Sequence, residues 1–303
     1  MKILLTGASG QLGNELYPRL SEFGEVTAVD LDCQHSNAEN CQRLDLGDSA
    51  ALEVMLNRLQ PDLIVNTAAY TAVDKAEDDT ELAFRINAQV PGRIARWAQR
   101  NECALMHYST DYVFDGTSQR PYKESDEPSP LNIYGESKLA GEKAIEASKC
   151  QHLIIRTSWV YSAHGSNFVL SMLKLGRDQL QLSVVDDQFG CPTWARNLAR
   201  VSCYLIQSGM EPASVGKGNI YHYCDADRMS WFDFAQLVFK TAVELGLLNE
   251  APELKRVSSG AYPQIAARPL FSVLDNFAIR ESGFDPVSLA DSLRACMMEL
   301  ENE

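Results

Sequence analysis

A tyrosine and a lysine four positions apart, Tyr134 and Lys138, are the residues whose types and spacing best suit acid–base chemistry in this chain. If the segment is helical, both side chains lie on one face. A phenol alone titrates near pH ~10, and a cation fixed beside it stabilises the phenolate and lowers its pKa. Such a tyrosine can protonate an oxygen that becomes an alkoxide as hydride reaches its carbon. The alternative is an ordinary solvated helix face.

A second group of polar residues, Ser109-Thr110-Asp111-Tyr112, ends a predicted strand over residues 103–109. Ligands of doubly wound sheets bind at the carboxyl ends of the strands, so Thr110 could donate a hydrogen bond to the same reacting oxygen. Thr110 could instead bond to its own backbone. The presence of both groups at one sheet edge favours the catalytic interpretation.

The chain opens with the elements of a dinucleotide site. Residues 2–6 form an apolar run of strand length, and the turn Gly7-Ala-Ser-Gly10-Gln-Leu-Gly13 leads into a segment with leucines at helical spacing. The glycines permit a tight turn, and the helix start offers unpaired N–H groups to a pyrophosphate. A second predicted strand, residues 25–30, ends in Asp30, where a dinucleotide fold binds the adenine ribose. This context favours nucleotide binding over an ordinary strand-to-helix turn.

Strand and helix patterns alternate further along the chain, which predicts the α/β class: a Rossmann-type doubly wound parallel sheet with a smaller C-terminal substrate-binding lobe. The NAD(P)-binding domain is expected over residues 1–160 and 197–225, and the lobe over 161–196 and 226–303, with the substrate in a cleft between them. Further strands are expected over residues 61–66, 103–109, 152–156, 181–185 and 219–223. Helices are expected over residues 49–59, 80–101 with a kink at Pro91, 134–147, 168–176, 197–208, 231–245 and 287–300, and a turn-rich loop over 186–193.

The composition of the chain excludes some classes of binding partner. The 303-residue chain has a net charge of −14, which argues against nucleic acid and anionic membranes because both require a basic surface. The first residues show no signal-peptide core, so a cytoplasmic protein is expected. The eight cysteines show no C-x-x-C spacing, so neither a metal site nor a disulfide framework is expected.

Several motifs resemble those of a known family. They are Thr6-Gly-Ala-Ser-Gly-Gln-Leu-Gly13, Ala69-Tyr-Thr-Ala-Val-Asp-Lys-Ala-Glu77, Ser109-Thr-Asp-Tyr-Val-Phe-Asp-Gly116, Tyr134-Gly-Glu-Ser-Lys-Leu-Ala-Gly-Glu142, Arg156-Thr-Ser-Trp-Val-Tyr161, Asp187-Gln-Phe-Gly-Cys-Pro-Thr193, Ser259-Gly-Ala-Tyr-Pro263 and Arg268-Pro269. Over nearly its whole length the chain resembles the dTDP-4-dehydrorhamnose reductase family of extended short-chain dehydrogenases/reductases. The resemblance implies NAD(P)H-dependent reduction of the C4 ketone of dTDP-4-dehydro-L-rhamnose to dTDP-L-rhamnose, a step of dTDP-rhamnose and polysaccharide biosynthesis.

The resemblance also implies roles for individual residues. Tyr134 donates the proton to the C4 oxygen, Lys138 lowers the pKa of Tyr134 and holds the nicotinamide ribose, and Thr110 polarises the ketone. The cofactor, NADPH or NADH, is expected at Gly7, Gly10, Gln11, Leu12, Asp30, Asp45, Leu46, Ala68, Ala69 and Tyr70, together with Tyr134 and Lys138. The nucleotide sugar is expected at Val73, Thr110, Asp111, Tyr112, Trp159 and Arg268, the last as a partner of the diphosphate.

Two of these positions bear on cofactor choice and packing. The Asp30 carboxylate suits the 2′-hydroxyl of NADH and repels the extra phosphate of NADPH, although members of the family accept NADPH. On residue type alone, Trp159 is more typical of a core residue than of a ligand contact.

The chain departs from the pattern of some family members at one position. Some members dimerise around a magnesium ion held by carboxylates, and the matching positions here are Glu15 and Arg196. Because a cation cannot ligate magnesium, no such metal site is expected. The assembly is therefore expected to be a monomer or a homodimer that does not depend on metal.

Other functions stay open at this stage. A nucleotide-sugar dehydratase typically carries glutamate where Tyr112 stands, which disfavours that activity. Another nucleotide-sugar 4-ketoreductase, an epimerase that keeps NAD bound, or a non-catalytic regulatory subunit similar to that of animal methionine adenosyltransferase would carry similar motifs. No motif separates these alternatives.

Overall fold

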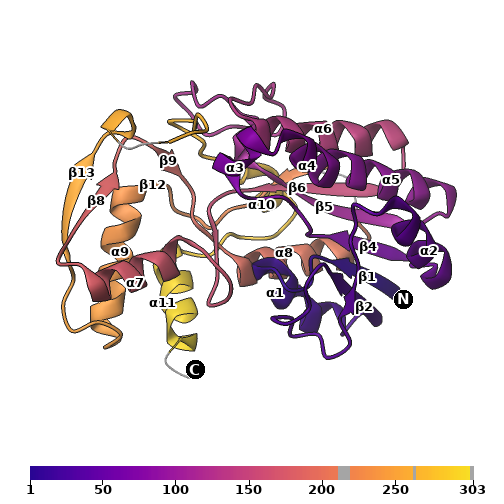
Figure 1. Ribbon diagram of the computed structural model, residues 1–303, viewed down its shortest axis with the longest axis horizontal. Helices are drawn as coiled ribbons and strands as arrows, with labels where there is room; N and C mark the ends of the chain where they lie inside the picture. Colours follow the sequence, from indigo (N-terminus) through magenta and orange to yellow (C-terminus); the bar gives the residue numbers. More distant parts are fainter. Residues whose placement is uncertain (211–218, 262–263, 301–303) are drawn as a thin grey trace.

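The computed structural model describes residues 1–210, 219–261 and 264–300, and its centre is a seven-stranded parallel sheet. The strand order is β11-β6-β5-β4-β1-β2-β3, so the direction of winding reverses between β1 and β4, as in a Rossmann-type sheet (Figure 1). The expected fold class is therefore confirmed. The strands are β1 (Lys2–Thr6), β2 (Glu25–Asp30), β3 (Gln42–Arg43), β4 (Leu63–Asn66), β5 (Ala104–Thr110), β6 (His152–Thr157) and β11 (Ile220–His222).

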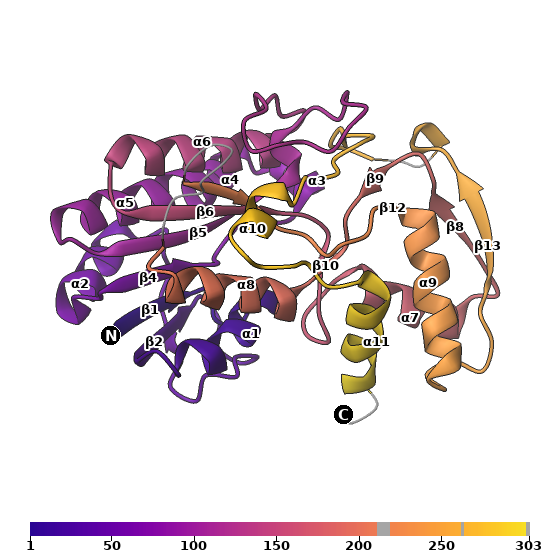
Figure 2. The ribbon, with the colours of Figure 1, turned by 180° about the vertical axis from the view of Figure 1, so that it is seen from behind.

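Helices cover both faces of this sheet and build two apolar cores. On one face lie α1 (Gln11–Leu20), α8 (Ala195–Gln207) and the short α10 (Phe277–Glu281), packed through leucines and alanines onto β1 and β5 (Figure 2). On the other lie α2 (Ser49–Leu59), α5 (Val90–Arg100) and α6 (Ile133–Ser148). Burial of both faces explains why the central strands are almost continuously apolar.

A second lobe has its own core. It contains α7 (Phe168–Asp178), β8 (Gln181–Val185), α9 (Trp231–Glu244), β13 (Glu253–Val257) and α11 (Leu289–Glu299). Strand β13 pairs in parallel with β8, although the charged run Glu253-Leu-Lys-Arg-Val257 gave no strand prediction. The boundaries between the two expected domains stay a prediction, and α10, within the range expected for the lobe, packs on the main sheet.

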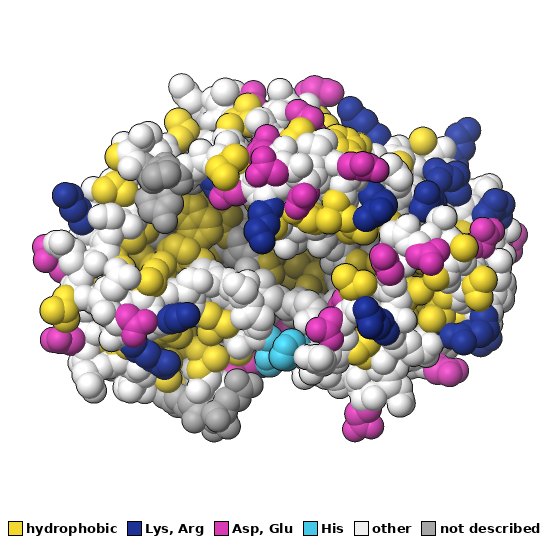
Figure 3. Space-filling view, in the orientation of Figure 1, with side chains coloured by type: hydrophobic (Ala, Val, Ile, Leu, Met, Phe, Trp, Pro, Cys, Tyr) yellow, Lys and Arg dark blue, Asp and Glu magenta, His cyan; other side chains and the backbone are white. Residues whose placement is uncertain are grey.

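Short strand pairs join the two lobes. β7 (Val160–Tyr161) pairs with β10 (Thr193–Trp194), and β9 (Phe189–Gly190) pairs with β12 (Met229–Ser230). The loop expected over residues 186–193 therefore contains ladder hydrogen bonds. Figure 3 shows the face of the molecule hollowed between the two lobes, with hydrophobic side chains in the hollow.

The helix expected over residues 80–101 is divided. α4 (Thr80–Phe84) runs into a π-helical turn (Arg85–Gln89) and then into α5. The residues before Pro91 keep helical backbone angles, so the helix continues through the π turn, which ends two positions before Pro91. The kink expected at Pro91 stays a prediction. A π turn inside a helix often marks a functional position, and here it carries Asn87.

The expectation of no disulfide is wrong at one place. Cys33 and Cys41 are bonded across the connection from β2 to β3, eight positions apart. Their spacing resembles no framework, and only the return of this loop to the sheet edge brings them together. Of the other six cysteines, five are buried and Cys203 is half-buried.

Within the described ranges, no helix is long and apolar enough to cross a membrane. Tyr262 and Pro263, part of the Ser259–Pro263 motif, lie outside the described residues.

Candidate active site

The carboxyl edge of β5 meets the start of α6, and this junction brings the expected catalytic residues together. Thr110 is the last residue of β5, and Tyr134 stands in the first turn of α6. Asn132 caps that helix, its Oδ1 accepting from the Gly135 N–H at 2.8 Å. The Thr110 hydroxyl lies close enough to the Tyr134 phenol to lower the pKa of that phenol. The cap thus fixes where α6 begins, and with it the place of the phenol beside the strand end.

Burial dominates the protonation of Tyr134. It raises the pKa of the phenol to about 12, and the nearby Thr110 hydroxyl offsets only part of that rise. The expectation that Lys138 lowers this pKa is therefore not what the structure shows, because the ammonium is directed to the main chain of β5. A raised pKa keeps the phenol protonated at neutral pH, which is the form that can donate a proton.

Lys138 is buried, with 3 % of its surface exposed, at the end of a polar chain behind the site. Its ammonium donates to the Tyr108 carbonyl at 2.6 Å and lies 3.5 Å from His107 Nε2. His107 Nδ1 lies 3.0 Å from Asn66 Nδ2, and Asn66 Oδ1 accepts from the Thr6 hydroxyl at 2.6 Å. Burial lowers the pKa of Lys138 to about 8 and holds the pKa of His107 well below its usual range, so His107 is neutral.

Asp111 accepts a hydrogen bond from the Thr110 hydroxyl. Thr110 Oγ1 donates to Asp111 Oδ1 at 3.0 Å and accepts from the Tyr112 N–H at 3.1 Å, while the Ser272 hydroxyl donates to Asp111 Oδ2. Burial raises the pKa of Asp111 to about 7, and these hydrogen bonds offset part of the rise. With 2 % of its surface exposed, Asp111 is placed to orient Thr110.

The glycine turn fits a dinucleotide. Gly7 has φ 73°, and a Cβ there would stand 2.6 Å from the Ala68 nitrogen; a Cβ on Gly13 would stand 2.1 Å from the Gly7 carbonyl oxygen. Only glycine permits this close approach of β1, α1 and the exit of β4. Gly10 is the N-cap of α1, and no side chain in the described part of the chain caps that helix end. Its N–H groups can therefore take a pyrophosphate.

Other expected cofactor residues surround the same edge. Asp30 ends β2, where its carboxylate accepts from the Ser9 and Leu31 N–H groups at 2.8 and 2.7 Å. Gln11 faces the other lobe, its Oε1 accepting from Ser162 and Asn167. The remaining members lie in the first turn of α1 (Leu12), between β3 and α2 (Asp45, Leu46) and directly after β4 (Ala68, Ala69, Tyr70).

Asn87 is a site residue that sequence reasoning missed. Its amide accepts from the Tyr70 N–H at 2.8 Å and donates to the Tyr70 carbonyl at 3.0 Å. The same amide donates to Ser137 Oγ at 3.0 Å, one position before Lys138. Asn87 therefore ties the loop after β4 to the catalytic helix. Its signal in the sequence was an asparagine inside an otherwise apolar helix face.

Two of the expected sugar and diphosphate residues, Arg268 and Tyr112, contact each other next to Tyr134. Arg268 makes a bidentate ion pair with Asp74, at 2.8 and 3.0 Å, and also lies against the Tyr112 hydroxyl. Tyr112 packs edge-on against Tyr134, with ring centroids 5.9 Å apart. Val73 begins α3 (Val73–Asp78), one position before Asp74.

Trp159 is held by stacking at a strained backbone. Its φ is 48°, in the left-handed region, and its ring stacks on Trp231 with centroids 3.4 Å apart. A Cβ on Gly190 would stand 2.4 Å from the Trp159 ring, so the indole also covers that glycine. Positive φ is uncommon for a non-glycine residue, and the expected contact of Trp159 with the sugar stays a prediction.

Arg196 stands where some members of the resembled family have a magnesium-binding carboxylate. Its guanidinium donates to Glu15 at 2.9 and 3.1 Å and pairs with Glu299. Glu15, His164 and Glu299 also lie close to one another. An arginine between the two glutamates balances their charge, and the expectation of no metal here stays a prediction.

Comparison with known proteins is consistent across the whole chain. The family model described as the RmlD substrate binding domain matches residues 1–302. A dTDP-4-dehydrorhamnose reductase of Salmonella typhimurium is 43 % identical over 269 residues, covering 89 % of this chain and 87 % of that protein. The structure of a dTDP-4-dehydrorhamnose reductase from Clostridium acetobutylicum is 34 % identical, with a TM-score of 0.88 over 99 % of this chain and 100 % of that one. One from Bacillus anthracis, in complex with NADP, is 33 % identical with a TM-score of 0.86 over 98 % and 99 %.

Proposed function

The chain belongs to the family of dTDP-4-dehydrorhamnose reductases, and on that premise we propose that it reduces the C4 ketone of dTDP-4-dehydro-L-rhamnose to dTDP-L-rhamnose. The observation that carries the proposal is the junction of Thr110, Tyr134 and Lys138 at one edge of the sheet, beside the glycine turn. The same site therefore offers a proton donor and a dinucleotide cradle.

NADH or NADPH supplies the hydride when bound, and the protein holds and protonates the substrate. Tyr134, protonated at neutral pH, gives its proton to the C4 oxygen. Lys138 stands on the same helix face, where it would hold the nicotinamide ribose and restore the charge balance once the phenol has lost its proton. Gly7, Gly10, Gln11 and Leu12 would hold the pyrophosphate. Asp30 would hold the adenine ribose, Asp45 and Leu46 the adenine, and Ala68, Ala69 and Tyr70 the nicotinamide end.

Thr110 polarises the ketone in this scheme, and Asp111 decides where its hydroxyl proton points. An ionised Asp111 accepts that proton at 3.0 Å, whereas a protonated Asp111 leaves Thr110 free to donate to the substrate oxygen. Because the pKa of Asp111 is raised to about 7, both forms are populated near neutral pH. Asp111 is thus a positioning residue that acts through Thr110.

The nucleotide sugar would enter the hollow between the lobes. Tyr112 and Trp159 would present aromatic surface to the sugar, and Val73 begins α3, one position before the Asp74 partner of Arg268. Arg268 is the cation for the diphosphate in a chain of net charge −14, and Asp74 balances its charge before the diphosphate binds. To bind it, the guanidinium would share its donors between the diphosphate and Asp74.

The cellular setting follows from the same premise. Reduction of a soluble nucleotide sugar for polysaccharide synthesis fits a cytoplasmic protein, acting as a monomer or homodimer.

The Asp30 carboxylate favours NADH at the adenine ribose. The ratio of kcat/KM for NADH to that for NADPH, in the parent chain and in Asp30→Ser, tests that preference.

The function is tested by incubating the protein with dTDP-4-dehydro-L-rhamnose and either NADH or NADPH. We expect the absorbance of NADH or NADPH to fall, and one equivalent of dTDP-L-rhamnose, identified by NMR, to form for each equivalent of cofactor oxidised. Formation of the C4 epimer of that product would indicate another 4-ketoreductase. Conversion without net NADH loss would indicate an epimerase, and NADH binding without any turnover would indicate a regulatory subunit.

A further inference from the structure

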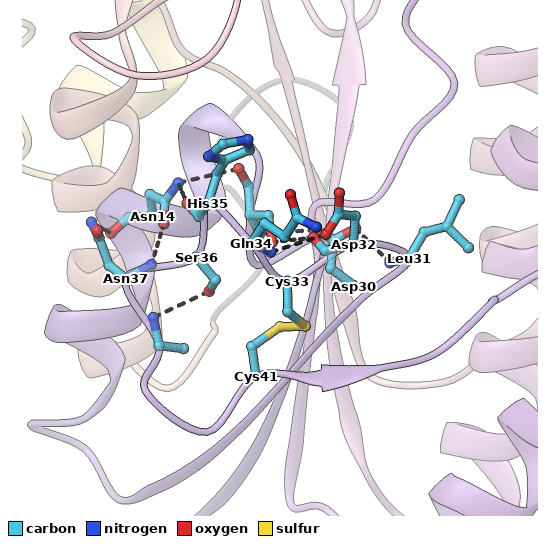
Figure 4. The surroundings of a disulfide bond; sticks show 12 residues. Asn14, Asp30, Leu31, Asp32, Cys33, Gln34, His35, Ser36, Asn37 and Cys41 are labelled. Carbon is cyan, nitrogen blue, oxygen red and sulfur yellow. Dashed lines mark hydrogen bonds between the residues drawn. A yellow bond between two sulfur atoms is a disulfide. The ribbon is translucent and has the colours of Figure 1, made fainter.

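The Cys33–Cys41 disulfide lies at the edge of the expected adenosine site (Figure 4). Cys33 follows Asp30 by three positions, and Cys41 directly precedes β3, which pairs with the end of β2. The Leu44 N–H also donates to the Asp30 carbonyl at 2.7 Å. The covalent bond therefore closes both ends of the loop 31–41 over the strand end that carries Asp30.

Hydrogen bonds connect this loop to the glycine turn. The Ser9 hydroxyl donates to the Asp32 carbonyl at 2.6 Å, and the Ser9 N–H donates to Asp30 Oδ2. Asn14 of α1 donates to the His35 carbonyl at 3.0 Å and accepts from the Asn37 N–H at 2.7 Å. Movement of the loop would therefore disturb the hydrogen bonds of Ser9 and Asn14. These two residues lie on both sides of the uncapped N-terminus of α1.

The loop has little else to hold it. Ala38 is its one buried residue, packed with Cys41 against the core under α1, and Asp32, Gln34 and His35 are exposed. A loop with so few apolar contacts gains order chiefly from its cross-link and its hydrogen bonds. Breaking the cross-link should release the loop and leave the fold of the sheet intact.

The two half-cystines are also the sulfur atoms best placed to react. Both are half-buried, whereas five of the six free cysteines are buried. Burial raises the pKa of the Cys203 thiol, the half-buried one, to about 11, so its thiolate is scarce at neutral pH. A dithiol reductant can attack one sulfur of the disulfide, form a mixed disulfide and leave as its own cyclic disulfide, delivering two electrons and two protons to Cys33 and Cys41.

We propose that the Cys33–Cys41 pair is a redox-sensitive modification site that sets the affinity of the dinucleotide site. In the disulfide form the loop 31–41 is preordered beside Asp30, and in the dithiol form the loop must be ordered when the adenosine end binds. The dithiol form then binds the cofactor more weakly, while Tyr134 and Lys138, at the other end of the site, keep their geometry. This inference rests on the proposed function for the identity of the ligand.

The test measures the dissociation constant of NADH by titration calorimetry before and after treatment with dithiothreitol. Alkylation and mass spectrometry of the unfolded chain count the thiols in each sample. We expect two additional alkylated cysteines, Cys33 and Cys41, after reduction, and a rise in the dissociation constant of roughly three- to tenfold, since ordering a released loop costs affinity. Reoxidation should restore the original value.

Variants separate this effect from general reduction. Cys33→Ser/Cys41→Ser should bind NADH like the reduced parent and show no response to dithiothreitol, and Cys203→Ser should behave like the parent in both states. If the double variant does not fold, reversible reduction of the parent chain carries the test. Equal dissociation constants in samples with verified oxidised and reduced thiols would overturn the proposal, as would free thiols at both positions under oxidising conditions. Absence of NADH binding in either state would instead count against the proposed function.

Discussion

The Lys138 ammonium donates a hydrogen bond to the Tyr108 carbonyl oxygen at 2.6 Å, so the catalytic helix is tied to the main chain of the strand that ends at Thr110. Because this acceptor belongs to the backbone of a central strand, the ammonium has a fixed direction. Together with the cap at Asn132, it places Lys138 and Tyr134 relative to Thr110. The predictions below depend on that placement.

The buried ammonium should control the alkaline limb of the pH profile. With its pKa lowered to about 8, Lys138 loses its charge above that pH, whereas Tyr134 keeps its proton. We expect kcat/KM to fall above pH 8 in the parent chain. In Lys138→Arg, whose cation does not titrate there, the residual activity should stay level through pH 9. An unchanged alkaline limb in Lys138→Arg would assign it to another group.

Lys138→Met should reduce kcat/KM by roughly 10²- to 10⁴-fold, the range for a group that assists proton transfer. It should also weaken the binding of NADH, because Lys138 is proposed to hold the ribose. Steady-state kinetics and calorimetry give the two effects separately. Lys240→Met, at an exposed position on α9, is the matched control and should keep the activity of the parent.

Asp111 should make stability depend on pH. Burial raises its pKa from 3.8 to about 7, so between those values the folded chain binds a proton that the unfolded chain has released. Its contribution to stability is full below pH 4 and is lost as pH rises through 7. Urea unfolding from pH 5 to pH 8 should therefore show a flatter pH dependence in Asp111→Asn than in the parent. The exposed Asp291→Asn should leave the pH dependence as it is, and an equal slope in all three chains would contradict the assignment.

The catalytic helix should depend on a buried ion pair. Arg156 of β6 and Glu142 of α6 are 0 % and 1 % exposed and bond at 2.7 and 2.9 Å. Glu142→Gln leaves the Arg156 charge buried and unpaired, which should lower the free energy of unfolding by about 3–5 kcal/mol. Glu244→Gln, which breaks an exposed pair with Arg294, should change it by about 0.5 kcal/mol or less. Similar losses in both variants would show that burial of the pair is unimportant.

Asn87 should hold the loop after β4 and the catalytic helix α6 in their places at the site. Asn87→Ala removes its bonds to Tyr70 and Ser137, and we expect a loss of about 1–3 kcal/mol in unfolding free energy together with a lower kcat. Asn101→Ala, at the exposed end of α5, is the control for stability. The informative readout is kcat in folded samples, since loss of stability alone would leave the turnover of the folded fraction unchanged.

Much of the sheet and its edge could be predicted from the sequence. Strands such as Glu25–Asp30 and helices such as Ser49–Leu59 have strong periodicity, and the structure reproduces those bounds. The meeting of Thr110 with Tyr134 followed from the rule that ligands bind at the carboxyl ends of parallel strands.

The features that were missed depend on contacts distant in sequence. The pKa of Tyr134 rises because of how deeply the phenol is buried, which helical spacing to Lys138 does not reveal. Strand β13 forms because β8 offers it an edge, and its own residues are mostly charged. The disulfide needs the loop after β2 to fold back, and the partners of Arg268 come from the far end of the chain.

The most direct test of the central claim is the rate of NADH oxidation with dTDP-4-dehydro-L-rhamnose in the parent chain and in Tyr134→Phe. If Tyr134 is the proton donor, Tyr134→Phe should bind NADH with nearly the parent affinity and lose roughly 10²- to 10⁴-fold in kcat. Tyr17→Phe, a half-buried tyrosine on α1 outside the site, should keep the parent rate. Parent-like turnover in Tyr134→Phe would contradict the assignment of the acid.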